Sequence, residues 1–524
     1  MSQKRILWAD DEIEILKPLV IFLQSMGHEV ETVTNGDDAL EAFAGADFDL
    51  VLLDENMPGR SGLDVLVEMK RARPGVPMVM VTKSEEQDTM RTALGAQVDD
   101  FLVKPVSLPQ LRVCVTKIFE QRDLVERQVC EQFQRAYAGL TMRIGECRSF
   151  DDWASLYRDI VGWELRLPGE MGAMLLQLKE AANQSFCKFV ARDYASWFSP
   201  AGSKSAPLFS HRLLSEVVKP ALKAGDKVAL VVIDNFRLDQ WEVIRPFLEA
   251  DFHIETSLYC SILPTATQYA RNAIFAGMLP ADIRKNYPEF WRDEAEEEDA
   301  LNKNERELLA DYFKRQRMDI ENSFYKVGSN ESGEDYIRGF AGSRNHKGYR
   351  NNRLNALVFN FVDALSHACT GNRTLKDLVP DDAAYRKVTR QWFLDGMMRR
   401  ILLLLKDSGF KIFLTTDHGT LRVNTPLDVV GPANLNRNLR YKVGKSLKYD
   451  PKRVLEILDP RAIAQVGLPA SSVAAQYVFA LNDGYFVYRN NRNEYVEKFA
   501  DSFQHGGVSM EEMILPLATL VGRG

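Results

Sequence analysis

Apolar and polar residues alternate along the first 120 residues in a pattern that predicts strands separated by amphipathic helices. Apolar runs of strand length occur at 5–10, 28–33, 49–54, 77–82 and 98–103. Segments with helical spacing lie at about 12–26, 37–44, 62–71 and 85–94, and a fifth begins near Ser107. Five strands that alternate with five helices predict a parallel, doubly wound α/β sheet of the flavodoxin-like type.

The residues at or just after the ends of these apolar runs are Asp10, Asp11, Asp54, Thr82 and Lys104. Because the carboxyl ends of parallel strands meet at one edge of a sheet, we expect these side chains to lie close together. Neighbouring carboxylates repel each other unless a cation intervenes, and Mg²⁺ is a cation that prefers oxygen ligands. Asp54 is then a candidate nucleophile for a phosphoryl group, whose oxygens Thr82 and Lys104 would bind.

This constellation and the segment LLDENMPGRSG (52–62) resemble the receiver domain of two-component response regulators. The resemblance assigns residues 1–122 to that domain and implies that a sensor histidine kinase phosphorylates Asp54. It also implies a cis bond between Lys104 and Pro105. The implied magnesium ligands are Asp10, Asp11, Asp54 and the backbone carbonyl of Asn56. The implied switch residues are Thr82, Phe101 and Lys104.

The segment from Ser107 to about residue 197 lacks strand signals and keeps its apolar residues at helical spacing. Two further helices are expected near 150–161 and 170–195, and residues 123–205 are predicted to form a helical bundle. The bundle could be a spacer or could transmit a signal, and the sequence leaves both possibilities open. No helix pair here has the basic recognition helix of a helix-turn-helix DNA-binding domain.

Strands and helices alternate again in residues 206–524, which are predicted to form a second α/β domain. Polar residues stand where its predicted strands end, where one helix begins and in a late glycine-rich loop. They are Asp234, Thr267, Asp363, His367, Asp417, His418 and His505. Carboxylates, imidazoles and a hydroxyl are what two divalent ions need in order to bind a phosphate ester.

The order of these motifs resembles the alkaline phosphatase superfamily and, within it, the PglZ family. The resemblance implies one zinc ion bound by Asp234, Thr267, Asp417 and His418. It implies a second zinc ion bound by Asp363, His367 and His505. Thr267 would be the nucleophile, with Thr265 as its rival two residues earlier. Ligand type favours zinc but leaves manganese open.

The two resemblances together indicate a PorX-like two-component response regulator, and they imply a role in type IX secretion and gliding. The expected activity is a zinc-dependent phosphodiesterase acting on cyclic or linear oligonucleotides and controlled by phosphorylation of Asp54. The alternative is a non-catalytic, metal-stabilised module that binds a transcription or secretion component. Because receiver domains often pair after phosphorylation, we also expect a phosphorylation-promoted homodimer.

Two basic runs are candidate binding sites for an oligonucleotide substrate, although an ordinary solvated surface explains them equally well. The first run contains Arg344, Lys347, Arg350 and Arg353. The second contains Arg437, Arg440, Lys442, Lys445 and Lys448.

Composition limits the class of protein. The formal net charge is −7, which disfavours a general nucleic-acid coat protein. No apolar run is long enough for a transmembrane helix, and the N-terminus lacks the apolar core of a signal peptide, so a cytoplasmic protein without membrane insertion is expected. Six scattered cysteines predict neither a disulfide framework nor a thiolate zinc site.

Overall fold

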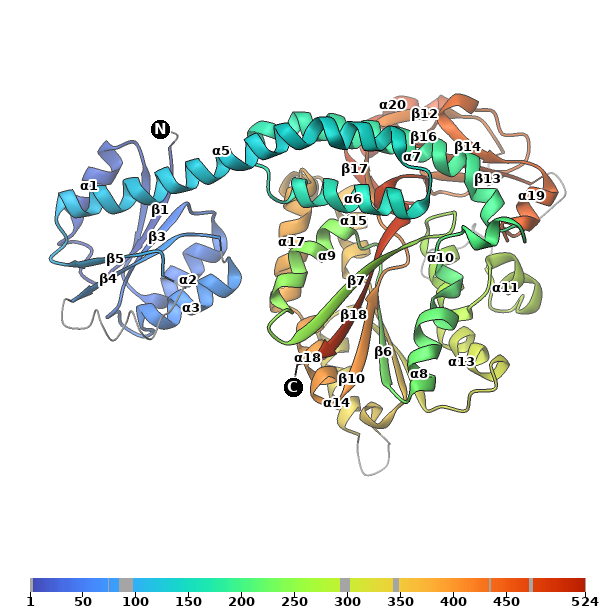
Figure 1. Cartoon of the computed structure of the whole chain (residues 1–524), viewed down its shortest axis with the longest axis horizontal. Helices are drawn as coiled ribbons and strands as arrows, with labels where there is room; N and C mark the ends of the chain where they lie inside the picture. Colours follow the sequence, from blue (N-terminus) through green and yellow to red (C-terminus); the bar gives the residue numbers. More distant parts are fainter. Residues whose placement is uncertain are drawn as a thin grey trace. The chain divides into compact units, whose positions relative to one another are not determined.

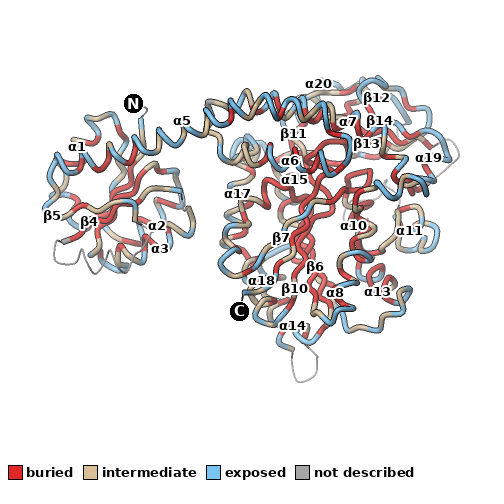
Figure 2. The backbone as a smooth tube through the Cα atoms, in the orientation of Figure 1, coloured by how far each residue is buried: buried red, intermediate tan, exposed pale blue. Residues whose placement is uncertain are grey.

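The computed structural model describes residues 3–73, 75–83, 98–292, 302–342, 348–432, 435–470 and 475–523. The chain divides into two compact units, Met1–Gln132 and Phe133–Gly524. Figure 1 shows the elements of each unit, and in Figure 2 the central strands of both main sheets are mostly coloured as buried.

The first unit contains a five-stranded parallel sheet with the order β2-β1-β3-β4-β5. Its strands are β1 (Arg5–Ala9), β2 (Glu29–Val33), β3 (Leu50–Asp54), β4 (Met78–Lys83) and β5 (Asp100–Lys104). Its described helices are α1 (Lys17–Ser25), α2 (Gly36–Gly45), α3 (Gly62–Ala72) and α5, which begins at Leu108. The five predicted strands and the doubly wound fold are confirmed, and the helix predicted at 85–94 lies outside the described residues.

The first helix starts five residues later than predicted. Residues 11–16 form turns, and the backbone N–H of Glu12 donates to the Asp10 side chain at 2.9 Å. Helix α1 then begins at Lys17 with Pro18 in its first turn, where a residue without an N–H is tolerated. Residues 12–16, which the periodicity assigned to the helix, therefore belong to the loop after β1.

The predicted helical segment consists of α5 (Leu108–Glu146), α6 (Phe150–Glu164) and α7 (Gly172–Trp197). Ser149 and Asp152 form a capping box that starts α6. From Phe133 onward, these helices share one hydrophobic core with the last 300 residues. The helical segment is therefore packed onto the second α/β fold and has no separate core of its own.

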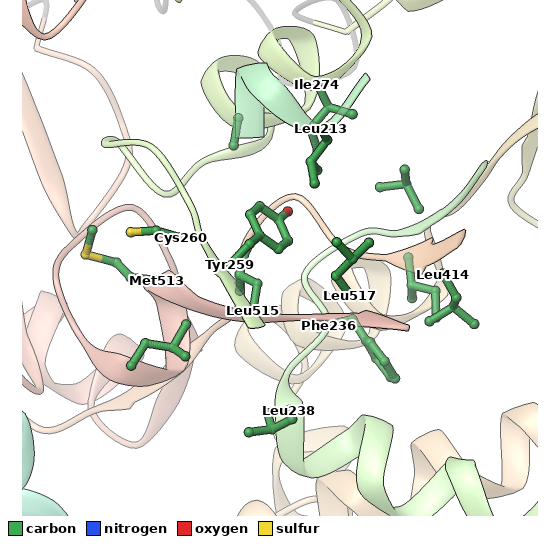
Figure 3. Packing of buried hydrophobic residues seen from close by; sticks show 14 of the residues in the cluster. Leu213, Phe236, Leu238, Tyr259, Cys260, Ile274, Leu414, Met513, Leu515 and Leu517 are labelled. Atoms are coloured by element: carbon green, nitrogen blue, oxygen red, sulfur yellow. The ribbon is translucent and has the colours of Figure 1, made fainter. Parts of the chain in front are cut away.

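The second unit is built on a six-stranded sheet with the order β7-β18-β10-β6-β9-β8. Its strands are β6 (Lys227–Ile233), β7 (Phe252–Cys260), β8 (Asn322–Val327), β9 (Leu354–Phe359), β10 (Phe410–Thr415) and β18 (Ile514–Gly522). Strands β8, β9, β6 and β10 are parallel, whereas β18 is antiparallel to both of its neighbours. Figure 3 shows Tyr259, Leu414, Leu515 and Leu517 from this sheet packed in one cluster.

Between β10 and β18 the chain forms three small sheets. They are β11 (Leu421–Val423) with β17 (Ser502–Gln504), β12 (Thr425–Val429) with β16 (Gly484–Tyr488), and β15 (Gln476–Ala480) between β13 (Tyr441–Gly444) and β14 (Val454–Ile457). Part of this region packs around two small apolar clusters of its own. These small sheets were not predicted from the sequence.

Two further observations bear on the class of protein. All six cysteines are free thiols, as their spacing predicted. Among the described residues, no helix combines the length and the hydropathy needed to cross a membrane.

Candidate active site

The first cluster of candidate ligands lies where β6 and β10 end. Asp234 follows β6, Asp417 and His418 follow β10, and their ligand atoms lie within 4.8 Å of one another. All three residues are buried. The Nδ1 atom of His418 lies 3.2 Å from the carbonyl oxygen of Gly419, which can only accept, so Nδ1 carries the proton and the Nε2 lone pair faces the cluster. The expected grouping of these three residues is present.

Close packing explains the glycine after the Asp-His pair. A Cβ atom at Gly419 would lie 2.0 Å from the backbone oxygen of Glu511, which is closer than any real contact. Glu511 lies in α21 (Met510–Met513), just beyond the loop that carries His505. Glycine therefore allows the β10 loop and the His505 loop to approach each other.

The second cluster contains Asp363, His367 and His505, again with ligand atoms within 4.8 Å. Asp363 and His367 lie one turn apart on α15 (Phe361–Gly371), which places both on one face. The apolar run at 354–363 predicts a strand that ends at Asp363, and this prediction is wrong at its end. Strand β9 (Leu354–Phe359) stops at Phe359, and Asp363 belongs to the first turn of α15. The side chain of His367 is 48% exposed, so this cluster has a side open to solvent.

The two clusters adjoin each other. The rings of His418 and His505 stack with centroids 4.3 Å apart. Asn235, which directly follows Asp234, joins the clusters through hydrogen bonds. Its backbone N–H donates to Asp417 at 3.3 Å, and its side-chain Nδ2 donates to Asp363 at 3.1 Å. Asn235 has φ of +62°, a left-handed conformation that asparagine tolerates better than most residues.

The structure separates the two candidate nucleophiles. The hydroxyl of Thr265 is buried, donates to the carbonyl of Gly507 at 2.9 Å and accepts from the N–H of Gly506 at 3.1 Å. The Oγ1 atom of Thr267 instead lies 3.0 Å from Nε2 of His418 and 3.4 Å from Oδ1 of Asp234. Thr265 is therefore a structural residue, and the geometry favours Thr267 as the nucleophile.

Thr267 is also the first residue of α10 (Thr267–Ala276), and no side chain caps that helix. The first N–H groups of a helix and its dipole favour an anion at this end. The hydroxyl of Thr267 and the start of α10 thus lie beside the carboxylates and the imidazole of the first cluster. A phosphate ester and divalent cations together suit that arrangement.

The electrostatics of the first cluster fit a bound cation. Burial raises the pKa of Asp234 and of Asp417 above the usual range of a carboxyl group. Asp417 Oδ2 has no hydrogen-bond partner within the described part of the chain. Burial lowers the pKa of His418, which keeps its imidazole neutral, as a metal ligand must be.

In the second cluster, burial alone would raise the pKa of Asp363. The hydrogen bond and the charge of His367 outweigh that effect, so the pKa of Asp363 lies below its usual range. An ionised carboxylate beside two imidazoles is a set of ligand types that zinc binds. The assignment of zinc to either cluster stays a prediction.

The first unit carries the third group of carboxylates. Ligand atoms of Asp10, Asp11 and Asp54 lie within 4.8 Å of one another at the carboxyl edge of the sheet. Lys104 Nζ lies 2.8 Å from Asp54 and 3.1 Å from Asp10, and the Lys104–Pro105 bond is cis, as predicted. Burial raises the pKa of Asp54. The buried Thr82 hydroxyl, on the neighbouring strand, has no hydrogen-bond partner in the described residues.

The described residues of the first basic run do not lie at the two clusters. Arg353 precedes β9 and donates to the carbonyls of Leu222 and Asp226, at the edge of the sheet opposite the two clusters. Arg350, in a short helical turn, is three residues earlier. The prediction fails for these two residues because a basic run in sequence does not specify a sheet edge. Arg344 and Lys347 lie outside the described residues.

The second basic run is partly structural. Arg440 and Lys442 are buried. Arg440 binds the Glu512 carboxylate, with Nη2 at 2.6 Å, and Glu512 accepts the N–H of Gly507 at 2.9 Å. Arg440 therefore supports the loop that carries His505 and cannot bind a substrate in solvent.

Comparisons with known proteins agree with this architecture. A family model described as the BREX system PglZ alkaline phosphatase-like domain matches residues 213–520. The response regulator receiver domain matches residues 6–116, and the PorX response regulator linker domain matches residues 123–198.

Two curated relatives each match about a quarter of this chain or less. The alginate biosynthesis transcriptional regulatory protein AlgB of Pseudomonas aeruginosa is 38% identical over 126 residues, which are 24% of this chain and 28% of that protein. The sensory transduction protein RegX3 of Mycobacterium tuberculosis is 39% identical over 106 residues, which are 20% of this chain and 46% of that protein. The chain thus spans less than half the length of either relative.

Two solved structures also match less than a quarter of this chain. The response regulator TrrA of Thermotoga maritima is 34% identical and covers 22% of this chain and 99% of that chain, with a TM-score of 0.21. A receiver domain protein from Clostridium thermocellum is 28% identical and covers 23% of this chain and 98% of that chain, with a TM-score of 0.22.

Fold, site and family matches define a response regulator whose receiver domain is joined to an alkaline phosphatase-like domain. The PglZ match spans more than half of the 524 residues, and the chain belongs to the PglZ family. With the receiver and linker matches, it is a PorX-like response regulator with a PglZ effector.

The roles of the two threonines predict different effects on stability. Thr265→Val leaves a buried N–H and a buried carbonyl without their partner, so we expect a loss of about 1–3 kcal/mol in the free energy of unfolding. Thr267→Val removes a hydroxyl that makes no backbone hydrogen bond in the described structure, and should cost less than about 1 kcal/mol. Denaturant unfolding of the metal-free protein measures both. Equal losses would contradict the structural role of Thr265.

Proposed function

We propose that the protein is a phosphorylation-controlled, zinc-dependent phosphodiesterase. The observation that carries this proposal is the position of the Thr267 hydroxyl, at the start of α10 and within 3.4 Å of both Asp234 and His418. Few structural roles require a hydroxyl beside two buried carboxylates and a buried imidazole. Membership of the PglZ family supports a phosphoesterase-type hydrolase.

The residues present fit two metal ions. Asp234, Asp417 and His418, with Thr267, would hold one ion, and Asp363, His367 and His505 would hold the other. Bound ions would supply positive charge for the attacking and leaving oxygens of the phosphate ester. The hydrogen bond from Nδ1 of His505 to the Thr265 carbonyl, at 3.3 Å, orients the imidazole so that Nε2 faces Asp363.

The chain's own groups then account for the displacement. Thr267 Oγ1 gives its proton to water and forms a bond to phosphorus while the bond from phosphorus to the leaving oxygen breaks, and the leaving oxygen takes up a proton from water. The N–H groups that begin α10 favour the phosphoryl oxygens. Water afterwards breaks the Oγ–P bond and restores the threonine.

The proposed substrate is a phosphodiester, with cyclic or linear oligonucleotides as the class to test first. This choice rests on the family resemblance. Arg350 and Arg353 do not support it, because they lie away from the two clusters. The receiver would be phosphorylated at Asp54 by a sensor histidine kinase, with a magnesium ion held by Asp10, Asp11, Asp54 and the carbonyl of Asn56. By resemblance, the output would act in type IX secretion and gliding.

Substitution of the nucleophile tests catalysis against the alternative of a metal-stabilised binding module. We expect Thr267→Ala to reduce phosphodiester hydrolysis by at least about 1,000-fold, because no other hydroxyl in the described site can replace it. Asp234, Asp417 and His418 remain as ligands in this variant, so it should still bind metal, and its unfolding midpoint should stay near wild type. Assays on a monoester, a small diester and an oligonucleotide measure the rates, and Asp417→Asn provides a control that loses metal. Unchanged signalling by Thr267→Ala in cells would favour the binding module.

Metal analysis tests the cofactor. Purified protein should contain about two zinc ions per chain in the second unit, and a chelator should remove both metal and activity. Each of Asp363→Asn and Asp417→Asn should lower the zinc content by about one ion. Manganese at equal occupancy, with restored activity, would contradict zinc as the resident metal.

The phosphorylation switch predicts a change in oligomeric state. Beryllofluoride with Mg²⁺ should convert the protein to a homodimer, because phosphorylation of a receiver commonly creates a pairing face. Light scattering measures the mass, and Asp54→Asn is the control that should not respond. A wild-type mass that stays unchanged would exclude dimerisation as the output of the switch.

A further inference from the structure

A buried chain of charged side chains stands behind the first cluster. Arg271 lies on α10, one turn after Thr267, and is 2% exposed. Its Nη1 donates to Oδ2 of Asp234, and its Nε donates to Glu305. Glu305 begins α13 (Glu305–Arg315), is fully buried, and lies 2.6 Å from Nζ of Lys326 on β8. Three separate elements, α10, α13 and β8, thus supply the side chains behind Asp234.

This contact divides the two oxygens of Asp234 between different partners. Arg271 binds Oδ2, whereas Oδ1 lies 3.4 Å from the Thr267 hydroxyl and 3.8 Å from Nε2 of His418. A carboxylate whose second oxygen is bound to a guanidinium can offer only the first oxygen to a metal ion or a hydroxyl. Its rotation is fixed as well, because the guanidinium is itself bound to Glu305.

The geometry of the contact is specific for arginine. Nη1 of Arg271 is also 3.9 Å from Oδ2 of Asp417, so one permanent cation faces both buried carboxylates of the first cluster. A planar guanidinium can bind Asp234 and Glu305 from two different nitrogens, whereas a lysine ammonium is a single point charge.

We propose that Arg271 is a positioning residue for the first metal site, which fixes Asp234 as a ligand through Oδ1 alone. Glu305 and Lys326 hold Arg271 in place. Such partners behind a ligand orient it and tune its metal site, and their loss commonly reduces metal affinity or activity about 10–100-fold. This inference rests on the proposed function, because it assumes that the cluster binds metal.

Arg271→Lys tests the proposal, because it keeps the charge and removes the two-sided contact. The Asp363→Asn background disables the second cluster, so that zinc titration by calorimetry reports the first cluster alone. We expect Arg271→Lys to raise the zinc Kd about 10–100-fold there. In the Asp417→Asn background, where the second cluster remains, Arg271→Lys should change the zinc Kd by no more than about 2-fold. In the otherwise wild-type protein kcat should fall while KM for a small diester changes little.

Arg353→Lys is the matched control, since Arg353 binds two backbone carbonyls at the opposite edge of the sheet. Arg353→Lys should leave the zinc affinity of both clusters unchanged. If Arg271→Lys does not fold, Glu305→Gln keeps the shape of the anchor, and it should weaken zinc at the first cluster only. A lower unfolding midpoint with both affinities unchanged would show that Arg271 is merely structural. No zinc binding by the wild type would overturn the proposed function, and this inference with it.

Discussion

The second unit depends on the balance of charge at the carboxyl edge of its sheet. Asp234 and Asp417 end up side by side, nearly excluded from water, where burial opposes ionisation of both. A buried carboxylate without a partner is very costly, so positive charge or donated hydrogen bonds must meet each oxygen. The hydrogen bonds of Asn235 and the ion pair of Arg271 meet part of this requirement. A metal ion would meet the rest.

The same requirement explains why the helical segment is packed against the site. Asn183 on α7 donates to Glu511 at 2.9 Å and accepts the N–H of Met510 at 2.8 Å. Lys179, one turn earlier on α7, lies 3.3 Å from Glu511. Met510 and Glu511 follow the loop that carries His505. Helix α7 therefore supplies the polar partners of a buried segment next to the second cluster. The helices are therefore part of the support of the site as well as a connection between two folds.

Sequence patterns located the five strands of the first unit, both α/β folds and the seven candidate ligands. A polar residue just after an apolar run marks the end of a strand, and therefore the edge of the sheet, without knowledge of the tertiary structure. They could not identify Arg271 or Asn235 as partners, because those contacts depend on tertiary structure. The choice between Thr265 and Thr267 required burial and hydrogen bonds, since both occupy the same PTAT segment. The basic runs were interpreted incorrectly because their contacts also depend on the tertiary structure. Arg353 donates to backbone carbonyls, and Arg440 donates to the Glu512 carboxylate.

Both folds place a tethered cation beside a pair of carboxylates, and the two cations suit different tasks. In the receiver, Lys104 Nζ lies 2.8 Å from Asp54 and 3.1 Å from Asp10. An ammonium on a flexible stem can move when a phosphoryl group arrives, which a switch requires. In the effector, Arg271 is bound on its other side to Glu305 and is almost fully buried. A guanidinium held in this way cannot follow a ligand, and a site that must present one carboxylate oxygen and one hydroxyl in a constant geometry gains from that rigidity.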